Sequence, residues 1–199
     1  IYPAYYSLTH DNVIAVTSST ISNKIASYAI PGSYLTIAAP GGEGVGNKFL
    51  GDIRNTDALI HVLRCFDDDN LSHIEGSVDP VRDIETINFE LQLKDLESVE
   101  KKIQRMEKLI KTGDKEAKKI LEVLQVYKAH LENFQNARSA PVEEADTKHV
   151  SDLFLLTMKP VLYVCNVDEA SAKTGNEYVG KVRAAIKDEN AELLVIAAA

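Results

Sequence analysis

The sequence is poor in cysteine and lacks any long apolar run. The only two cysteines, Cys65 and Cys165, each lie in a short apolar stretch typical of a buried strand, which predicts reduced thiols in a core rather than a disulfide framework. No stretch approaches the roughly 20 apolar residues of a membrane helix, and no basic-then-apolar leader opens the chain. We therefore expect a cytoplasmic protein that makes no membrane contact.

Charge is scarce in the first 42 residues, where Asp11 and Lys24 are the only charged side chains. The rest of the chain is densely charged, and the whole sequence has a net charge of -8. This step in composition near Gly41 predicts a boundary between two segments. The acidic balance argues against a nucleic-acid surface as the main feature, although the basic residues between Lys101 and Lys119 remain a candidate.

Three nearly continuous apolar runs predict strands that are covered on both faces in a parallel sheet. They are Asp57–Phe66, Pro160–Cys165 and Glu192–Ile196. Helical patterns before and between them complete an α/β alternation. In residues 1–42, short apolar runs separated by turn residues predict short β segments.

A long helical stretch between the first two runs predicts an antiparallel hairpin of two helices, broken at Thr112-Gly113-Asp114. Apolar residues recur at spacings of three and four and predict one shared seam. They are Leu96, Val99, Ile103, Met106 and Ile110, then Ile120, Leu124, Tyr127, Leu131 and Phe134. The hairpin is a spacer, the interpretation that we favour, or an arm that docks on RNA or an acidic partner.

Four segments of the N-terminal part resemble subtilisin-like serine proteases, in the region between the oxyanion asparagine and the nucleophile. They are Tyr2–Ala4, Asp11–Val16, Asn23–Tyr28 and Gly32–Gly41. The chemistry of that family needs an Asp, a His and a Ser in one site, and none of the segments that carry them is present. The resemblance therefore implies a remnant without protease activity.

A second set of segments, in order along residues 43–199, resembles the YchF/Obg-like ATPase family. They are Glu43–Leu50, Asp57–Phe66, Glu75–Pro80, Leu93–Glu100, Thr112–Lys115 and Val164–Glu169. The resemblance implies a P-loop (G-domain-like) nucleotide-binding domain, interrupted by a helical hairpin and followed by a small TGS domain. It also implies ATP hydrolysis with Mg²⁺, with GTP as a poorer substrate, and association with ribosomes.

Together the two resemblances imply three parts: a subtilisin-like β segment in 1–42, a partial nucleotide-binding α/β domain in 43–90 and 140–199, and a hairpin insertion in 91–139. The chain begins with Ile1 and ends in alanines after a strand pattern, which is typical of a sequence cut at both ends. Our hypothesis for its origin is a join of two genes, natural or artefactual, through a Gly-Glu pair that both families share.

Asn166 follows an apolar strand directly, at the edge where ligands of parallel α/β sheets bind. Its amide donates one hydrogen bond and accepts another, which suits adenine. Guanine-specific relatives carry Asn-Lys-x-Asp, whereas this chain has Asn166-Val167-Asp168-Glu169, which resembles an ATP-preferring variant. The alternative is that Asn166 only caps a helix.

The resemblance implies further site residues. Val167, Glu169 and Ala198 would join Asn166 around the base, and Gly44, Gly46 and Asn47 would belong to a switch loop. No residue set for Mg²⁺ is evident. The acidic run Asp67–Asp69 is interpreted as solvated, and the histidines, His61 among them, are interpreted as structural.

No Gly-x-x-x-x-Gly-Lys-Ser/Thr string, which a P-loop requires, occurs in the sequence. The nearest string, Gly175–Val182, lacks the hydroxyl and falls in a helical pattern. We therefore expect an incomplete ATP (or GTP) binding protein without catalysis of its own. The alternatives are a helical module that binds ribosome, RNA or protein through Lys101, Lys102, Lys118 and Lys119, and the subtilisin-like remnant.

Overall fold

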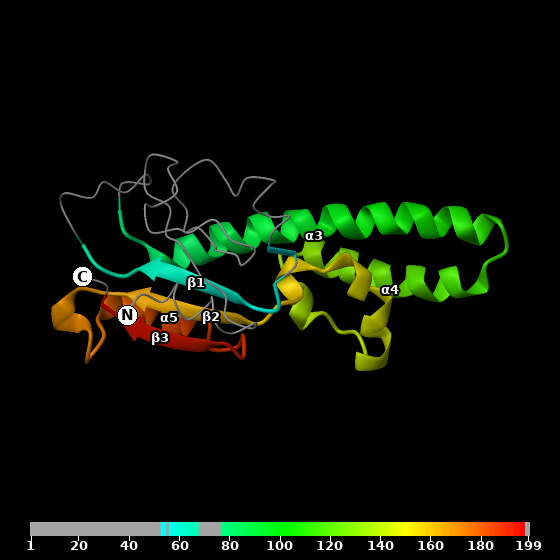
Figure 1. Cartoon of the computed structure of the whole chain (residues 1–199). Helices are drawn as coiled ribbons and strands as arrows, with labels where there is room; N and C mark the ends of the chain where they lie inside the picture. The colour runs from blue at the N-terminus through cyan, green and yellow to red at the C-terminus, as the bar shows by residue number, and fades with distance from the viewer. Residues whose placement is uncertain (1–52, 55, 68–76, 198–199) are drawn as a thin grey trace. The chain divides into compact units, whose positions relative to one another are not determined.

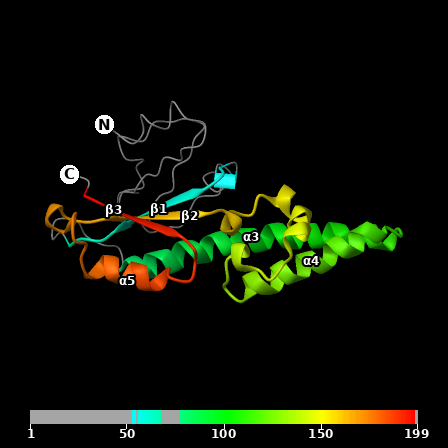
Figure 2. The same cartoon turned by 90° about the horizontal axis from the view of Figure 1, so that it is seen from below.

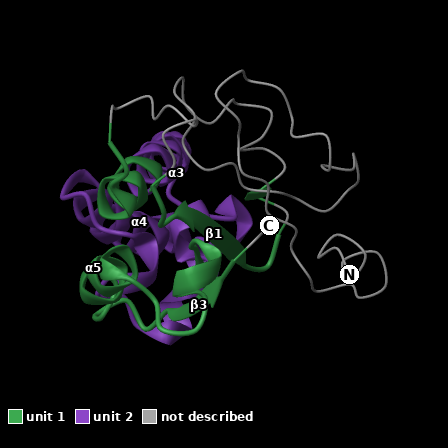
Figure 3. Ribbon diagram, turned by 90° about the vertical axis from the view of Figure 1, so that its left-hand side faces the viewer, with its two compact units in different colours: residues 1–87, 160–199 green, residues 88–159 purple. Residues whose placement is uncertain are grey.

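The structure is a computed structural model that describes residues 53–54, 56–67 and 77–197 (Figure 1). The chain divides into two compact units: unit 1 comprises residues 1–87 and 160–199, and unit 2 comprises residues 88–159 (Figure 3). The subtilisin-like segment 1–42 and the candidate residues Gly44, Gly46, Asn47 and Ala198 lie outside the described residues. No helix in the described ranges is long and apolar enough to cross a membrane.

Unit 1 contains the predicted parallel sheet. Its strands β1 (Leu59–Arg64), β2 (Val161–Asn166) and β3 (Glu192–Ile196) pair in parallel in the order β1-β2-β3 (Figure 1). One face packs on α5 (Glu177–Ala185), where buried side chains of the strands meet Val179 and Val182 (Figure 2). The prediction of an α/β fold with a parallel sheet is therefore confirmed.

Strand β3 differs from the prediction that all three runs are covered on both faces. Leu194 is 50% exposed, and Glu192 is also exposed, whereas Leu193 and Val195 pack against the core. Successive side chains of a strand point to opposite faces, so only one face of β3 is buried. Its apolar composition alone did not reveal this.

Both cysteines are buried free thiols, as predicted. Cys65 follows β1, and Cys165 lies in β2, where it pairs in register with Leu63. A hydrogen bond with Cys165, together with burial, raises the pKa of the Cys65 thiol well above its usual range. Cys65 is therefore a protonated core residue at neutral pH.

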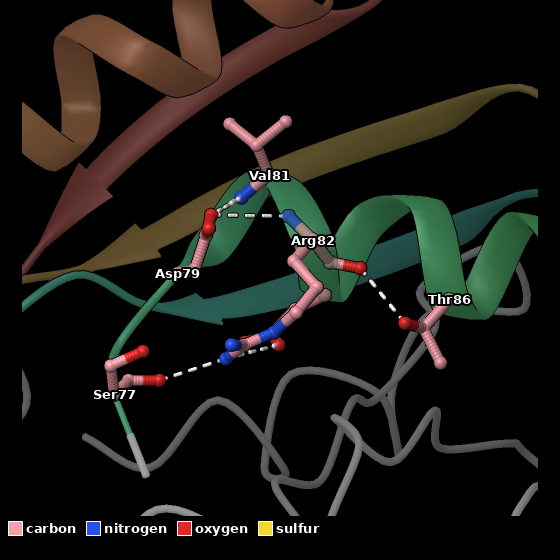
Figure 4. A network of polar contacts seen from close by, with 6 residues as sticks. Ser77, Asp79, Val81, Arg82 and Thr86 are labelled. Atoms are coloured by element: carbon pink, nitrogen blue, oxygen red, sulfur yellow. Dashed lines mark hydrogen bonds and ion pairs between the residues drawn. The ribbon is translucent and has the colours of Figure 1, made fainter. Parts of the chain in front are cut away.

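Helix α3 (Pro80–Lys111) begins with a dense polar cap (Figure 4). Asp79 Oδ1 accepts hydrogen bonds from the backbone N–H groups of Val81 (3.1 Å) and Arg82 (3.2 Å), and the Arg82 guanidinium donates to the Ser77 carbonyl (2.8 Å). Proline at the first helical position suits this start, because its missing N–H would have no partner in the helix. The sequence placed the hairpin's beginning at residue 91, but the helix already begins at Pro80.

The turn between α3 and α4 (Lys115–Glu132) lies where the sequence predicted it. Gly113 has a φ of 92°, a conformation that glycine adopts without strain. Asp114 caps α4 by accepting hydrogen bonds from the N–H groups of Glu116 (2.9 Å) and Ala117 (3.1 Å). The two helices therefore run antiparallel and side by side (Figures 1 and 2).

The predicted seam is the core of unit 2, with one exception. Its buried members are Val99, Met106, Leu124, Tyr127 and Leu131, and Leu96, Ile103, Ile110 and Ile120 pack against them. Phe134 was wrongly included, because it lies beyond the end of α4, has a left-handed φ of 56° and is 67% exposed. The helical period ends with the helix, so the spacing to Phe134 has no meaning.

Residues 140–159, which the sequence placed in the α/β domain, group with the hairpin in unit 2. This part contains short 3₁₀ helices at Glu144–His149, Ser151–Leu153 and Leu156–Met158, and a further one, Ala137–Ser139, directly precedes it. The fully buried Asp95 of α3 explains the grouping. Its carboxylate accepts hydrogen bonds from Leu156 N (2.7 Å), Thr157 N (2.7 Å) and Thr157 Oγ1 (2.8 Å), and thereby holds the end of this segment to the hairpin.

Candidate functional site

The candidate site lies at the carboxyl edge of the sheet in unit 1. Asn166 is the last residue of β2, and it pairs in register with Arg64 of β1 and with Ile196 of β3. It is half-buried on the middle strand of the described sheet. Ligands of parallel α/β proteins bind outside this edge of the sheet, so the strand end predicted to carry the site is in the required place.

The chain turns directly after Asn166, and the turn decides which groups face solvent. The Val167 N–H donates to the Ile196 carbonyl (2.8 Å), and the Val167 side chain is 3% exposed in the core. Val167 therefore has only main-chain atoms to offer a ligand, which the sequence did not indicate. Glu169 is exposed at the start of a 3₁₀ helix, Glu169–Ser171.

Asp168 shapes this turn. Its carboxylate accepts hydrogen bonds from Ser171 N (2.9 Å) and Ser171 Oγ (3.0 Å), which cap the 3₁₀ helix. The same bonds hold the pKa of Asp168 below its usual value, because they favour the charged form. Both carboxylates are exposed. That of Asp168 serves the cap and is thus structural.

The alternative that Asn166 is merely a helix cap is wrong. The cap of the 3₁₀ helix is Asp168, and the cap of α5 is Asn176. Asn166 belongs to β2 and caps neither helix.

Asn176 is the site residue that sequence reasoning missed. Its Oδ1 accepts from Val179 N (3.1 Å) as the cap of α5, while its Nδ2 donates to the carbonyl of Cys65 (2.7 Å). The Cys65 N–H in turn donates to the carbonyl of Asn166 (2.8 Å). The cap could have been found from an Asn before the acidic first turn of a helical pattern, but the bond to Cys65, 111 residues away, has no local signal.

A second contact joins α5 to the residues after β1. The Tyr178 hydroxyl donates to the Asp67 carboxylate, at 2.9 and 3.0 Å from its two oxygens. This bond raises the pKa of Tyr178. Asp67 was expected to be solvated; it is exposed, and it also has this specific partner. Asp68 and Asp69 lie outside the described residues.

The Gly175–Val182 string falls largely in a helix, as its pattern predicted. Gly180, Lys181 and Val182 lie inside α5, and the Lys181 ammonium pairs with Glu177 one turn away (2.8 Å). A phosphate-binding loop instead precedes its helix. Among the described residues no group of three His, Cys, Asp or Glu side chains could hold a metal ion.

The lysines proposed as a docking surface in unit 2 are not equivalent. Lys102 is only 8% exposed, and its ammonium donates to the His149 carbonyl (2.7 Å) and pairs with Asp152. Lys119 pairs with Asp146 (2.8 Å). Lys101 and Lys118 are exposed. Lys102 is therefore a structural cation, and the prediction of a four-lysine surface is wrong in that respect.

Comparison with known proteins supports the second resemblance. No family model matches the chain. The chain is 51% identical over 159 residues to the "Ribosome-binding ATPase YchF" of Bacillus subtilis, which covers 79% of this chain and 43% of that protein. It is 41% identical over 163 residues to "Obg-like ATPase 1" of Oryza sativa subsp. japonica, with coverages of 81% and 41%.

A solved structure agrees with these sequence matches. The structure of the Schizosaccharomyces pombe YchF GTPase superposes with a TM-score of 0.69 at 31% identity, and covers 80% of this chain and 44% of that chain. The chain thus has a parallel α/β fold similar to that of this YchF GTPase. Over the matched four fifths of its length, the chain belongs to the YchF/Obg-like ATPase family. It spans 41–45% of the length of the curated relatives that it matches.

Proposed function

We propose that this chain provides the base-recognition edge of a YchF/Obg-type nucleotide site and binds ATP in preference to GTP. One observation carries the proposal: Asn166 ends the middle described strand of a parallel sheet, and an exposed Glu169 follows it on a capped turn. The printed names of the relatives, which include ATPase and GTPase, support nucleotide as the ligand.

The chemistry of the two side chains suits adenine. The Asn166 amide supplies one donor and one acceptor, and the Glu169 carboxylate accepts from an exocyclic amino group. Val167 contributes through its main chain only, since its side chain is buried. Ala198 completes the proposed set by resemblance, and it lies outside the described residues.

Phosphate binding and hydrolysis do not form part of this proposal. The sequence has no P-loop string, and the proposed switch loop at Gly44, Gly46 and Asn47 has no described geometry. Magnesium ion would accompany the phosphates of the nucleotide, and the described residues offer it no ligand cluster. The base edge is therefore the part of the family's site for which this chain supplies the chemistry.

The proposal is tested by titrating the full chain with a fluorescent ATP analogue, with and without Mg²⁺, in competition with ATP and GTP. We expect saturable binding that ATP displaces better than GTP. Asn166→Ala should lower the affinity about tenfold, because the base loses the side-chain amide as its hydrogen-bond partner. Asn133→Ala in unit 2 is the matched control and should bind as the parent chain does. Absence of binding at millimolar nucleotide would refute the proposal.

The division at residue 42 is part of the same proposal. The relatives match 159 to 165 residues, or 79–83% of the chain, so about a fifth of the chain lies outside the match. The assignment of residues 1–42 to a separate, subtilisin-like segment without activity rests on the step in composition near Gly41 and on the resemblance. A fluorophosphonate probe for active-site serines should leave the chain unlabelled, and a labelled serine within 1–42 would overturn that assignment.

A second candidate function is ribosome or RNA binding through the tip of the hairpin. The last turn of α3 carries Lys108 and Lys111, and α4 begins with Lys115 and Lys118; all are exposed. The relatives named as ribosome-binding support this partner. Clustered lysines bind phosphate backbones in a salt-dependent way.

The test is co-sedimentation with ribosomes at increasing salt. The double variant Lys111→Gln/Lys115→Gln should bind several-fold more weakly and show a shallower salt dependence. The control variant Lys173→Gln/Lys187→Gln removes the same charge from exposed positions of unit 1 and should have little effect. Equal losses in the two variants would point to a general charge effect and would contradict a role of the tip.

A further inference from the structure

Both ends of the loop that carries Glu169 are held by Cys65, the residue that directly follows the neighbouring strand β1. The main-chain N–H of Cys65 donates to the carbonyl of Asn166 (2.8 Å), where the loop begins. The main-chain carbonyl of Cys65 accepts from the amide of Asn176 (2.7 Å), where the loop ends. Cys65 thus closes loop 166–176 through its backbone, and Asn176 is the only side chain in this pair of bonds.

The interior of the loop is also held by short-range bonds. Asp168 accepts from Ser171, and the Gly175 N–H donates to the Ser171 carbonyl (2.8 Å). Gly175 has a φ of 72°, which turns the chain into Asn176 at little cost for a glycine. These bonds fix the internal shape of the loop, and the bonds to Cys65 fix the loop to the sheet.

We propose that Asn176 is a positioning residue for base recognition. By holding the Cys65 carbonyl, its amide keeps Cys65 in register with Asn166 and so fixes the directions of the Asn166 and Glu169 side chains. This inference rests on the proposed function of those two residues. Asn176 itself does not contact the base.

The two roles of Asn176 can be separated, because they use different atoms. The Oδ1 atom caps α5 at Val179, and the Nδ2 atom holds Cys65. Ser and Asp both cap helices well. An ionised Asp carboxylate has no hydrogen to donate, and the shorter Ser side chain has a single oxygen, which cannot take the places of both Oδ1 and Nδ2. Asn176→Ser and Asn176→Asp therefore keep the cap and remove the bond to Cys65, whereas Asn176→Ala removes both.

The control variant is Tyr178→Phe. It removes the bond to Asp67, which also joins α5 to the chain after β1, but it leaves the bonds of Cys65 in place. If the Asn176 variants act by weakening the attachment of α5 in general, Tyr178→Phe should change hydrogen exchange and nucleotide affinity as well. If they act through the backbone of Cys65, it should not.

The experiment measures amide hydrogen exchange and competitive nucleotide binding on the full chain. In Asn176→Ser and Asn176→Asp, we expect the amides of Cys65 and Gly175 to exchange about tenfold faster, and the affinity for ATP and its preference over GTP to fall about tenfold. Tyr178→Phe should change both by less than about twofold. This pattern would support the positioning role.

The remaining outcomes overturn different statements. Unchanged exchange at Cys65 and Gly175 in both variants would overturn the role of Asn176 in holding the loop, whatever the nucleotide affinity. Faster exchange with unchanged affinity in a parent chain that binds ATP would overturn its role in recognition. Faster exchange in a chain that binds no nucleotide would overturn the proposed function, and with it base recognition, while the mechanical link from Asn176 to the loop would stand.

Discussion

The two units stabilise their functional candidates in different ways. In unit 2 the hairpin is held by a seam of apolar side chains that recur every three or four residues, with Leu124 and Tyr127 at its centre. In unit 1 the loop after β2 is held by main-chain groups and by one amide whose partner lies 111 residues away. The difference shows that side-chain periodicity specifies the scaffold, whereas the geometry of the candidate site depends on contacts between distant segments.

The largest expected effect is the loss of a seam residue. Leu124→Ala should lower the free energy of unfolding by about 3 kcal/mol, because it leaves a cavity in a fully buried position. Leu109→Ala, at a 40% exposed position of α3, should cost well under 1 kcal/mol as the control. Residue-resolved hydrogen exchange should show the loss of protection in α3 and α4 above all. Equal acceleration in β1 and β2 would mean that the units unfold together, and would break the comparison.

The next effect concerns pH and is expected in unit 1. His61 is buried in β1, its ring 5.7 Å from that of Tyr163, and burial lowers its pKa to about 4. In the unfolded state the pKa of His61 is higher, so the unfolded chain takes up the proton first as the pH falls. The free energy of unfolding is therefore highest above pH ~6.5 and decreases towards pH ~4, by up to about 3 kcal/mol. His61→Gln should flatten this dependence in denaturant titrations between pH 7 and 4. An unchanged slope would assign the acid sensitivity to other groups.

A smaller effect is expected from the buried carboxylate of unit 2. Asp95→Asn should cost about 2 kcal/mol, since an amide has one oxygen for the donors that two carboxylate oxygens now accept from Leu156 and Thr157. Urea denaturation followed by circular dichroism measures the change. Asp188→Asn, at an exposed position, is the matched control and should cost well under 1 kcal/mol. Equal costs would show that burial of Asp95 does not matter.

The smallest effect compares the caps of α4 and α5. Asp114→Ala should cost about 1 kcal/mol, the usual value of a helix cap. Asn176→Ala should cost roughly twice as much, because it also removes the bond to Cys65. Thermal unfolding of the two variants measures the difference. If Asn176→Ala costs no more than Asp114→Ala, the bond from Asn176 to Cys65 adds nothing to stability. Contacts between distant segments would then matter less in unit 1 than its hydrogen bonds suggest.

The sequence predicted those structural features that depend on residues close together along the chain. The strands, the turn at Gly113 and most of the seam follow from local period and composition, and Asn166 follows from its place after an apolar run. The errors have one cause: Phe134, Lys102 and Leu194 were assigned from spacing or composition, but their exposure depends on where a helix ends or on what a distant segment covers. Asn176 was missed for the same reason.

Cys65 holds the loop with peptide atoms alone, and its thiol takes no part in either bond. The identity of residue 65 is therefore almost irrelevant to the loop, and side chains of similar volume could replace one another there across a lineage without altering it. Proline is the exception, since it lacks the N–H that reaches Asn166.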